Sequence, residues 1–280
     1  MFNPLLRCVQ QARFKKQLRW FFALKEDPAT LADYTRMIKV AVCTALQNTA
    51  LVPHFLYDGE ENDLTQWLRS KHVAVIPSRS SLLDALEAKV RESPEGGRLC
   101  SILGGALLRL EIPRIMKEHG WDDEFVLYTD CDVMFLRDPV PALRRLRPRL
   151  FAVAPQTQQK NYVKMNSGVM WMNIPGMLAV NPHFFSFCFE NIDRVIEGAD
   201  QRAYREFFDG RWDRLPPEMN WKPYWGENRR ASIIHFHGPK AYEFSAATHR
   251  FHIEIIQRLA RGAYRHYSEV WEGLMTGIRE

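Results

Sequence analysis

FVLYTDCDVMFLRDP occupies residues 125–139, and this stretch of the sequence decides the fold. Its apolar start, from Phe125 to Tyr128, is typical of a strand that is buried on both faces. Two carboxylates follow, Asp130 and Asp132, before the chain becomes apolar again. Because alternate residues of an extended segment point the same way, the two side chains are expected to face one point. Carboxylates so close together repel each other unless a cation lies between them, so the pair predicts a site for a hard ion such as Mg²⁺ or Mn²⁺.

Strands and helices are predicted to alternate ahead of this stretch. Residues 18–24 form an apolar run typical of a buried strand, and Leu31, Tyr34 and Ile38 recur at helical spacing within a helix predicted over 29–49. Further predicted elements in this half are strands at residues 52–59 and 73–77 and a helix at 63–72. This alternation predicts an α/β fold, with a mostly parallel sheet that is flanked by helices on both faces.

The rest of the chain continues the pattern. In an open α/β sheet the ligand crevice lies outside the carboxyl ends of the strands. Asp130, Asp132 and His235 all fall at such ends, so they are expected near one crevice. Pro113 is expected to break or kink the helix that contains it. The elements predicted here are strands at residues 149–156, 164–175 and 231–240 and helices at 101–120, 181–198, 200–210 and 247–280.

Length and composition limit the classes of protein to consider. A chain of 280 residues is near the upper end of what one hydrophobic core supports, and no Gly/Ser/Pro-rich linker divides it. We therefore expect a helical extension at residues 1–17, one catalytic domain at 18–246 and a helical tail at 247–280 packed on that domain. A net charge of +5 and a pI near 9.0 suit an anionic partner such as a nucleotide phosphate. The sequence has no zinc-finger spacing, RNP motif or basic zipper, so no nucleic-acid partner is expected.

The cysteines and the apolar runs bear on the compartment. Five scattered cysteines without a CxxC pair are typical of a reducing environment. The sequence lacks both a bilayer-spanning apolar run and the core of a signal peptide, so we expect a cytoplasmic protein. The basic, aromatic segments 1–24 and 247–280 would suit peripheral contact with an anionic membrane surface. Packing of these segments on their own domain is the alternative that we favour.

The second chemical signal is IIHFHGPKAY at residues 233–242. His235 and His237 share one face of an extended strand, and a histidine there is suited to complete a metal site. Gly238 permits a close approach of the backbone, and the charge of Lys240 is suited to neutralise a phosphate. The simpler alternative is a pair of hydrogen-bonded histidines at the end of a strand.

Six segments, in a shared order, make the sequence resemble the family 8 glycosyltransferases. That family has the GT-A fold of nucleotide-diphospho-sugar transferases and includes bacterial lipopolysaccharide galactosyl- and glucosyltransferases and glycogenin. Each segment is a loose match alone, and their common order makes the resemblance specific. The segments are LADYTRMIKVAVCTALQNTALVPHFLYDG (31–59), LLRLEIPRI (107–115), VLYTDCDVMF (126–135), MNSGVMWMNI (165–174), ADQRAYREFF with WDRLPPEMNW (199–208 and 212–221) and IIHFHGPK (233–240).

The resemblance implies a role for each matching residue. Asp130, Asp132 and His235 would hold the metal, with Mn²⁺ or Mg²⁺ as the ion, and Asp130 would also reach the ribose. Asp200 and Gln201 would hydrogen-bond the sugar or lie beneath its anomeric carbon, as the catalytic residues. The donor-binding residues, near the diphosphate or the sugar, would be Arg109, Asp130, Asn166, Ser167, Gly168, Gly238 and Lys240.

Each of these roles has a simpler structural alternative. Asp130 and Asp132 would cap turns in an exposed loop. Arg109 would be an ordinary arginine on a helix surface. The segment Asn166–Gly168 would be only a turn that enters a strand. Asp200 would be the N-cap of the helix that follows it.

As a whole, the resemblance implies a metal-dependent, anomer-retaining transferase. It would move a hexose from UDP-glucose or UDP-galactose to a hydroxyl group of a glycan such as lipopolysaccharide, a lipid or a protein. The chain departs from the family pattern at Arg202 and Arg205, which replace an acid and an asparagine, and Lys240 comes one residue early. Two other functions stay open. One is a haloacid-dehalogenase-type phosphatase that uses Asp130 and Asp132, and the other is a non-catalytic protein that binds a sugar nucleotide.

Overall fold

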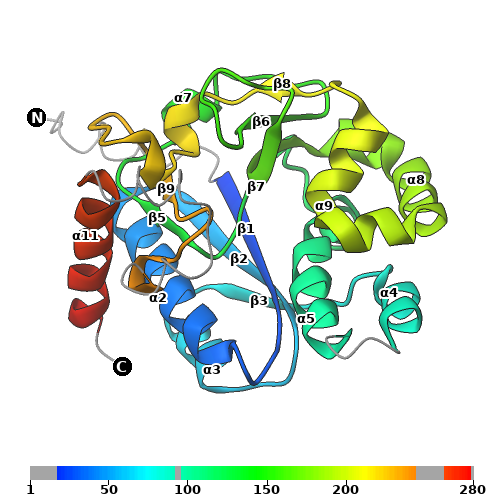
Figure 1. Ribbon diagram of the computed structural model, residues 1–280, viewed down its shortest axis with the longest axis horizontal. Coiled ribbons are helices and arrows are strands. Elements are labelled where there is room, and N and C mark those ends of the chain that lie inside the picture. Colours follow the sequence, from blue (N-terminus) through cyan, green and yellow to red (C-terminus); the bar gives the residue numbers. More distant parts are fainter. Residues whose placement is uncertain (1–17, 92–95, 244–261, 279–280) are drawn as a thin grey trace, which may run out of the picture.

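The computed structural model describes residues 18–91, 96–243 and 262–278. A seven-stranded sheet with the strand order β3-β2-β1-β4-β7-β6-β8 lies at its centre (Figure 1). Strands β1 to β4 run parallel to one another, whereas β7 runs antiparallel to both β4 and β6. The predicted α/β fold with a mostly parallel sheet is therefore confirmed. The strands are β1 (Leu18–Lys25), β2 (Leu51–Asp58), β3 (Ala74–Pro77), β4 (Phe125–Thr129), β6 (Phe151–Pro155), β7 (Met165–Asn173) and β8 (Asp213–Arg214).

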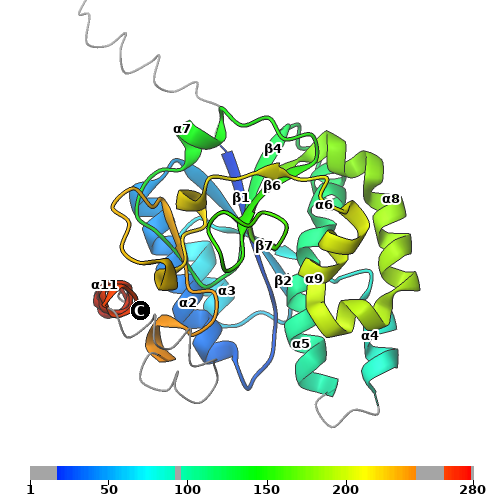
Figure 2. The same cartoon turned by 45° about the horizontal axis from the view of Figure 1, so that its top comes forward.

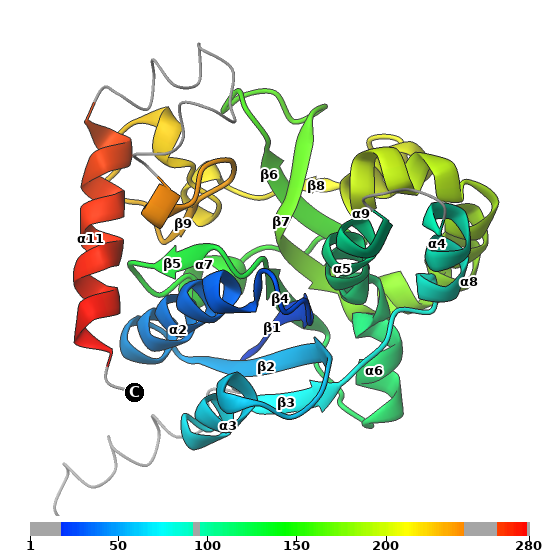
Figure 3. The same cartoon turned by 60° about the horizontal axis from the view of Figure 1, so that its bottom comes forward.

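Helices cover both faces of the sheet, as Figures 1 and 3 show. The central strands are buried on both sides because their alternate residues serve two separate cores. In β1, Trp20 and Phe22 pack into the core on one face, whereas Phe21 packs into the core on the other. One face carries α2 (Leu31–Asn48), α3 (Asp63–Ser70) and α7 (Val140–Leu143); the other carries α4 (Leu83–Val90), α5 (Gly96–Leu107), α6 (Ile112–Glu118), α8 (Ile174–Glu190) and α9 (Ile192–Phe208).

A small antiparallel pair outside the main sheet positions the second half of the site. Strand β5 (Val133–Phe135) pairs with β9 (Ile233–His235), and Val133 lies directly opposite His235. The C-terminal helix α11 (Ala263–Gly277) packs beside this pair and α2, where it buries Tyr264 and Trp271. Within the described residues, no helix is both long and apolar enough to cross a bilayer.

Several predicted elements differ in their bounds from the observed ones. The apolar segment 125–136 divides into β4 and β5, and Asp130–Asp132 form the turn between them. The helix predicted at 101–120 consists of α5, a 3₁₀ turn (Leu108–Glu111) and α6, with Pro113 in the first turn of α6. Helix α4 was not predicted.

The helix predicted at 181–198 is wrong, because it spans the end of one observed helix and the start of the next. Helix α8 already begins at Ile174, and α9 runs from Ile192 past the predicted boundary; Figure 2 shows the two helices side by side. At that boundary, however, Ala199 has the non-helical angles φ 52° and ψ −161°, which break α9. The helical tail is observed over 263–277, while the predicted extension at 1–17 and the tail residues 247–261 lie outside the described residues.

Candidate functional site

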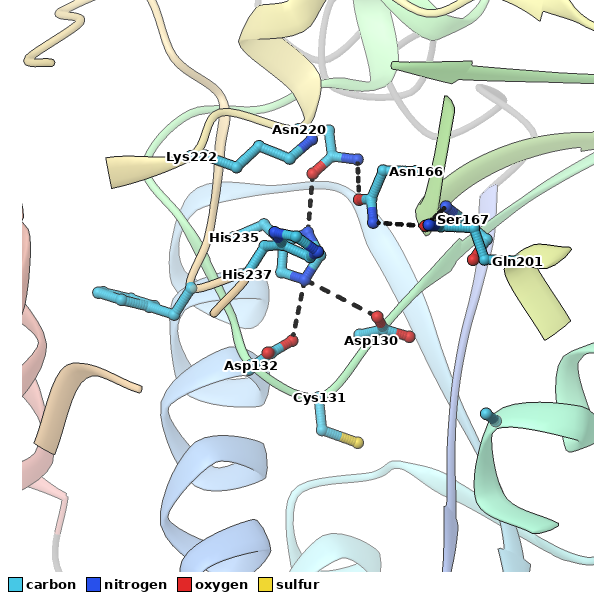
Figure 4. Close-up of polar contacts among 12 residues, drawn as sticks. Asp130, Cys131, Asp132, Asn166, Ser167, Gln201, Asn220, Lys222, His235 and His237 are labelled. Atoms are coloured by element: carbon cyan, nitrogen blue, oxygen red, sulfur yellow. Dashed lines mark hydrogen bonds and ion pairs between the residues drawn. The ribbon is translucent and has the colours of Figure 1, made fainter. Parts of the chain in front are cut away.

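Two acids and a histidine meet where β4 leaves the sheet. Asp130, Asp132 and His235 each offer a ligand atom, and these atoms all lie within 4.8 Å of one another (Figure 4). The Nε2 atom of His235 is 3.2 Å from Asp132 Oδ1 and 3.7 Å from Asp130 Oδ2. The pairing of β5 with β9 explains this convergence, because it places His235 opposite the residue that follows Asp132. The structure thus brings His235 to two acids that precede it by more than a hundred positions in the sequence.

The surroundings of these residues fit a divalent cation. Asp132 Oδ1 is buried and accepts no hydrogen bond from any described residue, although a buried carboxylate oxygen normally has a partner. Gly168 packs so closely that a Cβ there would lie 2.2 Å from His235 Cε1 and 2.7 Å from Asp130 Oδ2. Two carboxylates and one imidazole suit Mn²⁺ or Mg²⁺ through their oxygens and a transition metal through the nitrogen. The three residues are therefore a candidate metal centre.

Arg109 lies beneath the acids and links them to Asp200. Its guanidinium donates to Asp130 Oδ1 at 2.8 Å and to the Ser167 carbonyl at 2.7 Å, and it lies 3.2 Å from Asp200 Oδ2. Only 3% of Arg109 is exposed, so the alternative of a surface arginine is wrong. Burial alone would lower the pKa of Arg109, but Asp130 and Asp200 raise it above its ordinary value, which keeps the guanidinium charged.

The break in α9 turns Asp200 and Gln201 toward the site. Ala199 adopts a positive φ that is uncommon for a residue with a side chain, and such strain often occurs at functional sites. Asp200 is buried, and burial raises its pKa while Arg109 opposes that shift. Gln201 Oε1 accepts hydrogen bonds from Asn166 Nδ2 at 2.9 Å and from the Ser167 backbone N–H at 3.2 Å. The predicted donor-site residues of β7 therefore contact the predicted catalytic residues of α9.

Lys240 reaches the acid pair from the segment that follows β9. Its Nζ lies 2.5 Å from Asp132 Oδ2. Burial alone would raise the pKa of Asp132, but Lys240 and His235 hold it well below its usual range. Gly238 has a φ of 102°, in the region that favours glycine, so a side chain there would strain the approach to Lys240. His237 faces Tyr224, whose hydroxyl is 3.1 Å from its Nδ1, and it does not join the cluster.

A cavity of about 230 Å³ opens beside these groups. It extends from the end of β1 and the start of α2, at Lys25 and Tyr34, to Asp132 and Lys240. Burial raises the pKa of Tyr34, so its phenol stays protonated and is able to donate a hydrogen bond into the cavity. The sequence pattern had assigned Tyr34 only to the buried side of a helix, because helical spacing does not show where a cavity interrupts the core.

Two further residues beside His235 received no role from the sequence. Asn220 is fully buried, and its Oδ1 is 2.9 Å from His235 Nδ1. Lys222 is also fully buried; its Nζ donates to the Pro155 carbonyl at 2.8 Å, and burial lowers its pKa well below the ordinary value. Both follow a short 3₁₀ turn (Pro217–Met219) in a segment without strand or helix periodicity. The resemblance of WDRLPPEMNW to the family pattern was the one signal that pointed to this segment.

Comparisons with known proteins establish the fold. No protein-family model matches the sequence, and no curated protein sequence matches it. The galactosyltransferase LgtC, in complex with donor and acceptor sugar analogues, superposes with a TM-score of 0.62 at 16% identity, covering 94% of this chain and 97% of LgtC. Mouse xyloside xylosyltransferase 1 gives 0.53 at 14% identity, over 78% and 96% of the two chains.

A longer protein shares the fold as well. The glycosyltransferase GlyE of Streptococcus pneumoniae TIGR4 gives a TM-score of 0.59 at 14% identity over 94% of this chain. The chain spans 63% of the length of GlyE. At these identities the likeness concerns the architecture, and it confirms the predicted GT-A fold.

Proposed function

We propose that this protein is a metal-dependent, anomer-retaining glycosyltransferase. It transfers a hexose, glucose or galactose, from a UDP-sugar to a hydroxyl group of a glycan, a lipid or a protein. The observation that carries this proposal is the convergence of Asp130, Asp132 and His235 beside a cavity that the two acids line, in a GT-A fold. In this proposal the region 18–246 is the catalytic domain, and the packing of α11 on α2 supports a tail that rests on the same domain.

The chemistry follows from the charges that surround the cavity. A divalent cation bound by the three ligands would stabilise negative charge on the departing diphosphate. Lys240 lies beside that position and adds a second positive charge for the same purpose. Arg109 neutralises Asp130 and Asp200 from below, so both acids keep fixed positions. The acceptor hydroxyl then attacks from the face that the diphosphate leaves, and its proton passes to a phosphate oxygen, so no side-chain nucleophile is required.

Hydrogen bonds at Asp130 favour the transferase over the phosphatase. A phosphatase of the haloacid-dehalogenase type requires the first acid to attack phosphorus. Asp130 Oδ1 accepts hydrogen bonds from Arg109 at 2.8 Å and from Tyr128 at 3.0 Å, and Oδ2 faces His235. Both oxygens are thus directed to protein groups, which suits a metal ligand better than a nucleophile.

The altered segment after Gln201 is compatible with catalysis. Arg202 forms ion pairs with Glu197 and Glu206 at the surface. Arg205 donates to Gln156 Oε1 at 2.5 Å and to the Met165 carbonyl at 2.8 Å, where it holds the start of β7. Neither arginine displaces Asp200 or Gln201 from the site, so a non-catalytic role receives no support from this substitution.

A second cavity provides a place for the acceptor. It has a volume of about 570 Å³ and begins at Arg205, one helical turn beyond Gln201 on α9. Its other lining residues combine aromatic rings with an exposed guanidinium and are Tyr162, Val163, Asp209, Gly210, Trp212 and Arg214. Aromatic surface with arginine suits a saccharide that carries an anionic group such as a phosphate.

Turnover of the donor tests the proposed function. With Mn²⁺, the protein is expected to release UDP from UDP-glucose or UDP-galactose, and Asp132→Asn should lower that rate by about a hundredfold or more. Asp193→Asn is the matched control, because Asp193 lies on α9 in an exposed ion pair with Lys89. Undiminished turnover by Asp132→Asn would remove the metal role, and phosphate release from a phosphomonoester without UDP release would support the phosphatase.

A further inference from the structure

A chain of three carboxamides connects the donor-sugar side of the site to the metal ligand His235. Gln201 Oε1 accepts from Asn166 Nδ2 at 2.9 Å, and Asn166 Oδ1 accepts from Asn220 Nδ2 at 3.0 Å. Asn220 Oδ1 then lies 2.9 Å from His235 Nδ1 (Figure 4). Asn166, Asn220 and His235 are at most 3% exposed, so water does not substitute for these contacts.

The direction of every hydrogen bond that links the three carboxamides follows from one backbone group. The Ser167 N–H, 3.2 Å from Gln201, is only a donor, so the Gln201 atom that faces it must be the carbonyl oxygen. Asn166 must present its NH₂ group to that same oxygen, because two carbonyl oxygens at 2.9 Å would repel each other. Its oxygen therefore accepts from Asn220, and Asn220 turns its own oxygen to His235. The hydrogen-bond network thus fixes the orientation of all three amides.

The last link decides which ring nitrogen of His235 carries hydrogen. Because Asn220 Oδ1 is an acceptor, His235 Nδ1 must donate to it. In the neutral imidazole the lone pair then lies on Nε2, which faces Asp132 Oδ1 at 3.2 Å and Asp130 Oδ2 at 3.7 Å. Turning the ring over would place the carbon Cδ2 against Asn220 Oδ1 and lose this hydrogen bond. Metal-binding histidines commonly have their orientation fixed in this way by a partner on the other nitrogen.

We propose that Asn220 and Asn166 are positioning residues that hold His235 with hydrogen on Nδ1 and its Nε2 lone pair toward the two acids. This inference rests on the proposed metal site and goes beyond it, because it assigns the orientation of a ligand to residues that contact neither the acids nor a cation. The same hydrogen bonds also fix the orientation of the Gln201 amide. Both lone pairs of its oxygen are engaged by Asn166 and Ser167, so Gln201 presents its NH₂ group to the sugar and does not act as a nucleophile through oxygen.

Metal affinity in the absence of donor tests the chain at its His235 end. Asn220→Leu removes the acceptor and should weaken Mn²⁺ binding by about 10- to 100-fold in an electron paramagnetic resonance titration. Asn220→Asp keeps an acceptor for Nδ1 but loses the donor to Asn166 Oδ1, so it should lose less Mn²⁺ affinity than Asn220→Leu and keep hydrogen on Nδ1. Asn181→Leu is the control, because Asn181 is another buried asparagine, on α8 and outside the site. A purely structural role for Asn220 would instead make its Asp and Leu variants bind Mn²⁺ equally.

The Gln201 end provides a test at longer range. The side chain of Gln201→Glu still accepts hydrogen bonds from Ser167 and Asn166. In Gln201→Leu, by contrast, the Asn166 amide is free to exchange the positions of its oxygen and its NH₂ group. We therefore expect weaker Mn²⁺ binding in Gln201→Leu and near-normal binding in Gln201→Glu, although the side chain at position 201 does not contact His235. Equal affinities in these two variants would overturn the idea that direction is transmitted along the chain.

A spectroscopic readout separates this inference from the proposed function. In ¹⁵N-labelled wild type, with or without Mg²⁺, His235 should show hydrogen bonded to Nδ1, and the signal should be lost or shared with Nε2 in Asn220→Leu. Wild type that binds no Mn²⁺ would refute the proposed function, while the ¹⁵N measurement would still decide the inference. Hydrogen on Nε2 alone in the wild type would overturn the inference whatever the enzyme activity.

Discussion

Replacing Gly168 by alanine is expected to displace the side chains of His235 and Asp130 relative to that of Asp132. The new Cβ would lie 2.2 Å from His235 Cε1, whereas ordinary contact begins at 3.4 Å, so the ring or the strand must move by about 1.2 Å. Metal sites tolerate ligand displacements of only about 0.2 Å. The substitution should therefore weaken Mn²⁺ binding at least about tenfold, which corresponds to about 1.4 kcal/mol. Overpacking of the buried strand should cost a further stability loss of about 1–3 kcal/mol.

Two measurements on the same protein separate these effects. Titration with Mn²⁺ gives the affinity, and urea unfolding without metal gives the change in the free energy of unfolding. Gly97→Ala is the matched control, because Gly97 lies in α5 and a Cβ there would meet nothing within 4 Å. That control should keep the metal affinity and raise stability by up to about 1 kcal/mol, since alanine favours a helix. Wild-type affinity and stability in Gly168→Ala would refute the argument that this glycine provides the space for the ligands.

Three other predictions concern charge. Arg109→Leu should lower the free energy of unfolding by about 3–5 kcal/mol in urea, because it removes the positive charge that pairs with Asp130 and the buried Asp200. The pKa of Asp132 is depressed in the folded protein, so its contribution to stability is present above the unfolded value of about 3.9 and is lost as the pH falls below it. Asp132→Asn should accordingly lose less stability than wild type between about pH 7 and about pH 3 in metal-free urea titrations, and a parallel loss would contradict the assigned shift. Arg214→Ala should raise the KM for a phosphorylated acceptor about tenfold or more relative to an uncharged one, and an equal change for both would exclude charge recognition there.

The acid pair was predictable because the residues that carry its chemistry are close together in the sequence. A buried strand that ends in Asp130 and Asp132 is unusual enough to indicate a cation, and the order of elements placed the pair at the carboxyl end of a sheet. The pairing of β5 with β9 was not predictable in the same way, since three-residue strands carry too little pattern to identify their partners. The resemblance, rather than periodicity, linked His235 to the acids.

The helices around Gln201 show a different limit. Asn173 caps α8 through its side chain, and Pro175 lies in the first turn, which is the usual signature of a helix start. The prediction instead started a helix at Asn181 and so placed Pro182 near its beginning, although Pro182 lies inside α8. The position of the break at Ala199 agrees with the predicted boundary between residues 198 and 200, but its positive φ was not predictable, because that conformation usually selects glycine or asparagine. Tertiary contacts of the following residues with Arg109 and Asn166 override that preference.

Charge balance explains how the acid pair folds before a cation arrives. A buried carboxylate without a partner is costly, and here each acid has its own cation, Arg109 for Asp130 and Lys240 for Asp132. The two cations differ in mobility: Arg109 is also fixed by Ser167 and Asp200, whereas Lys240 has a flexible stem and a side chain that is 29% exposed. A divalent ion at Asp132 Oδ1, which accepts no hydrogen bond from the described residues, would leave the contact of Lys240 with Oδ2 in place. Under the proposed function, the flexible stem of Lys240 would let its ammonium turn from Asp132 to the departing diphosphate, since Lys240 and Asp132 line the same cavity.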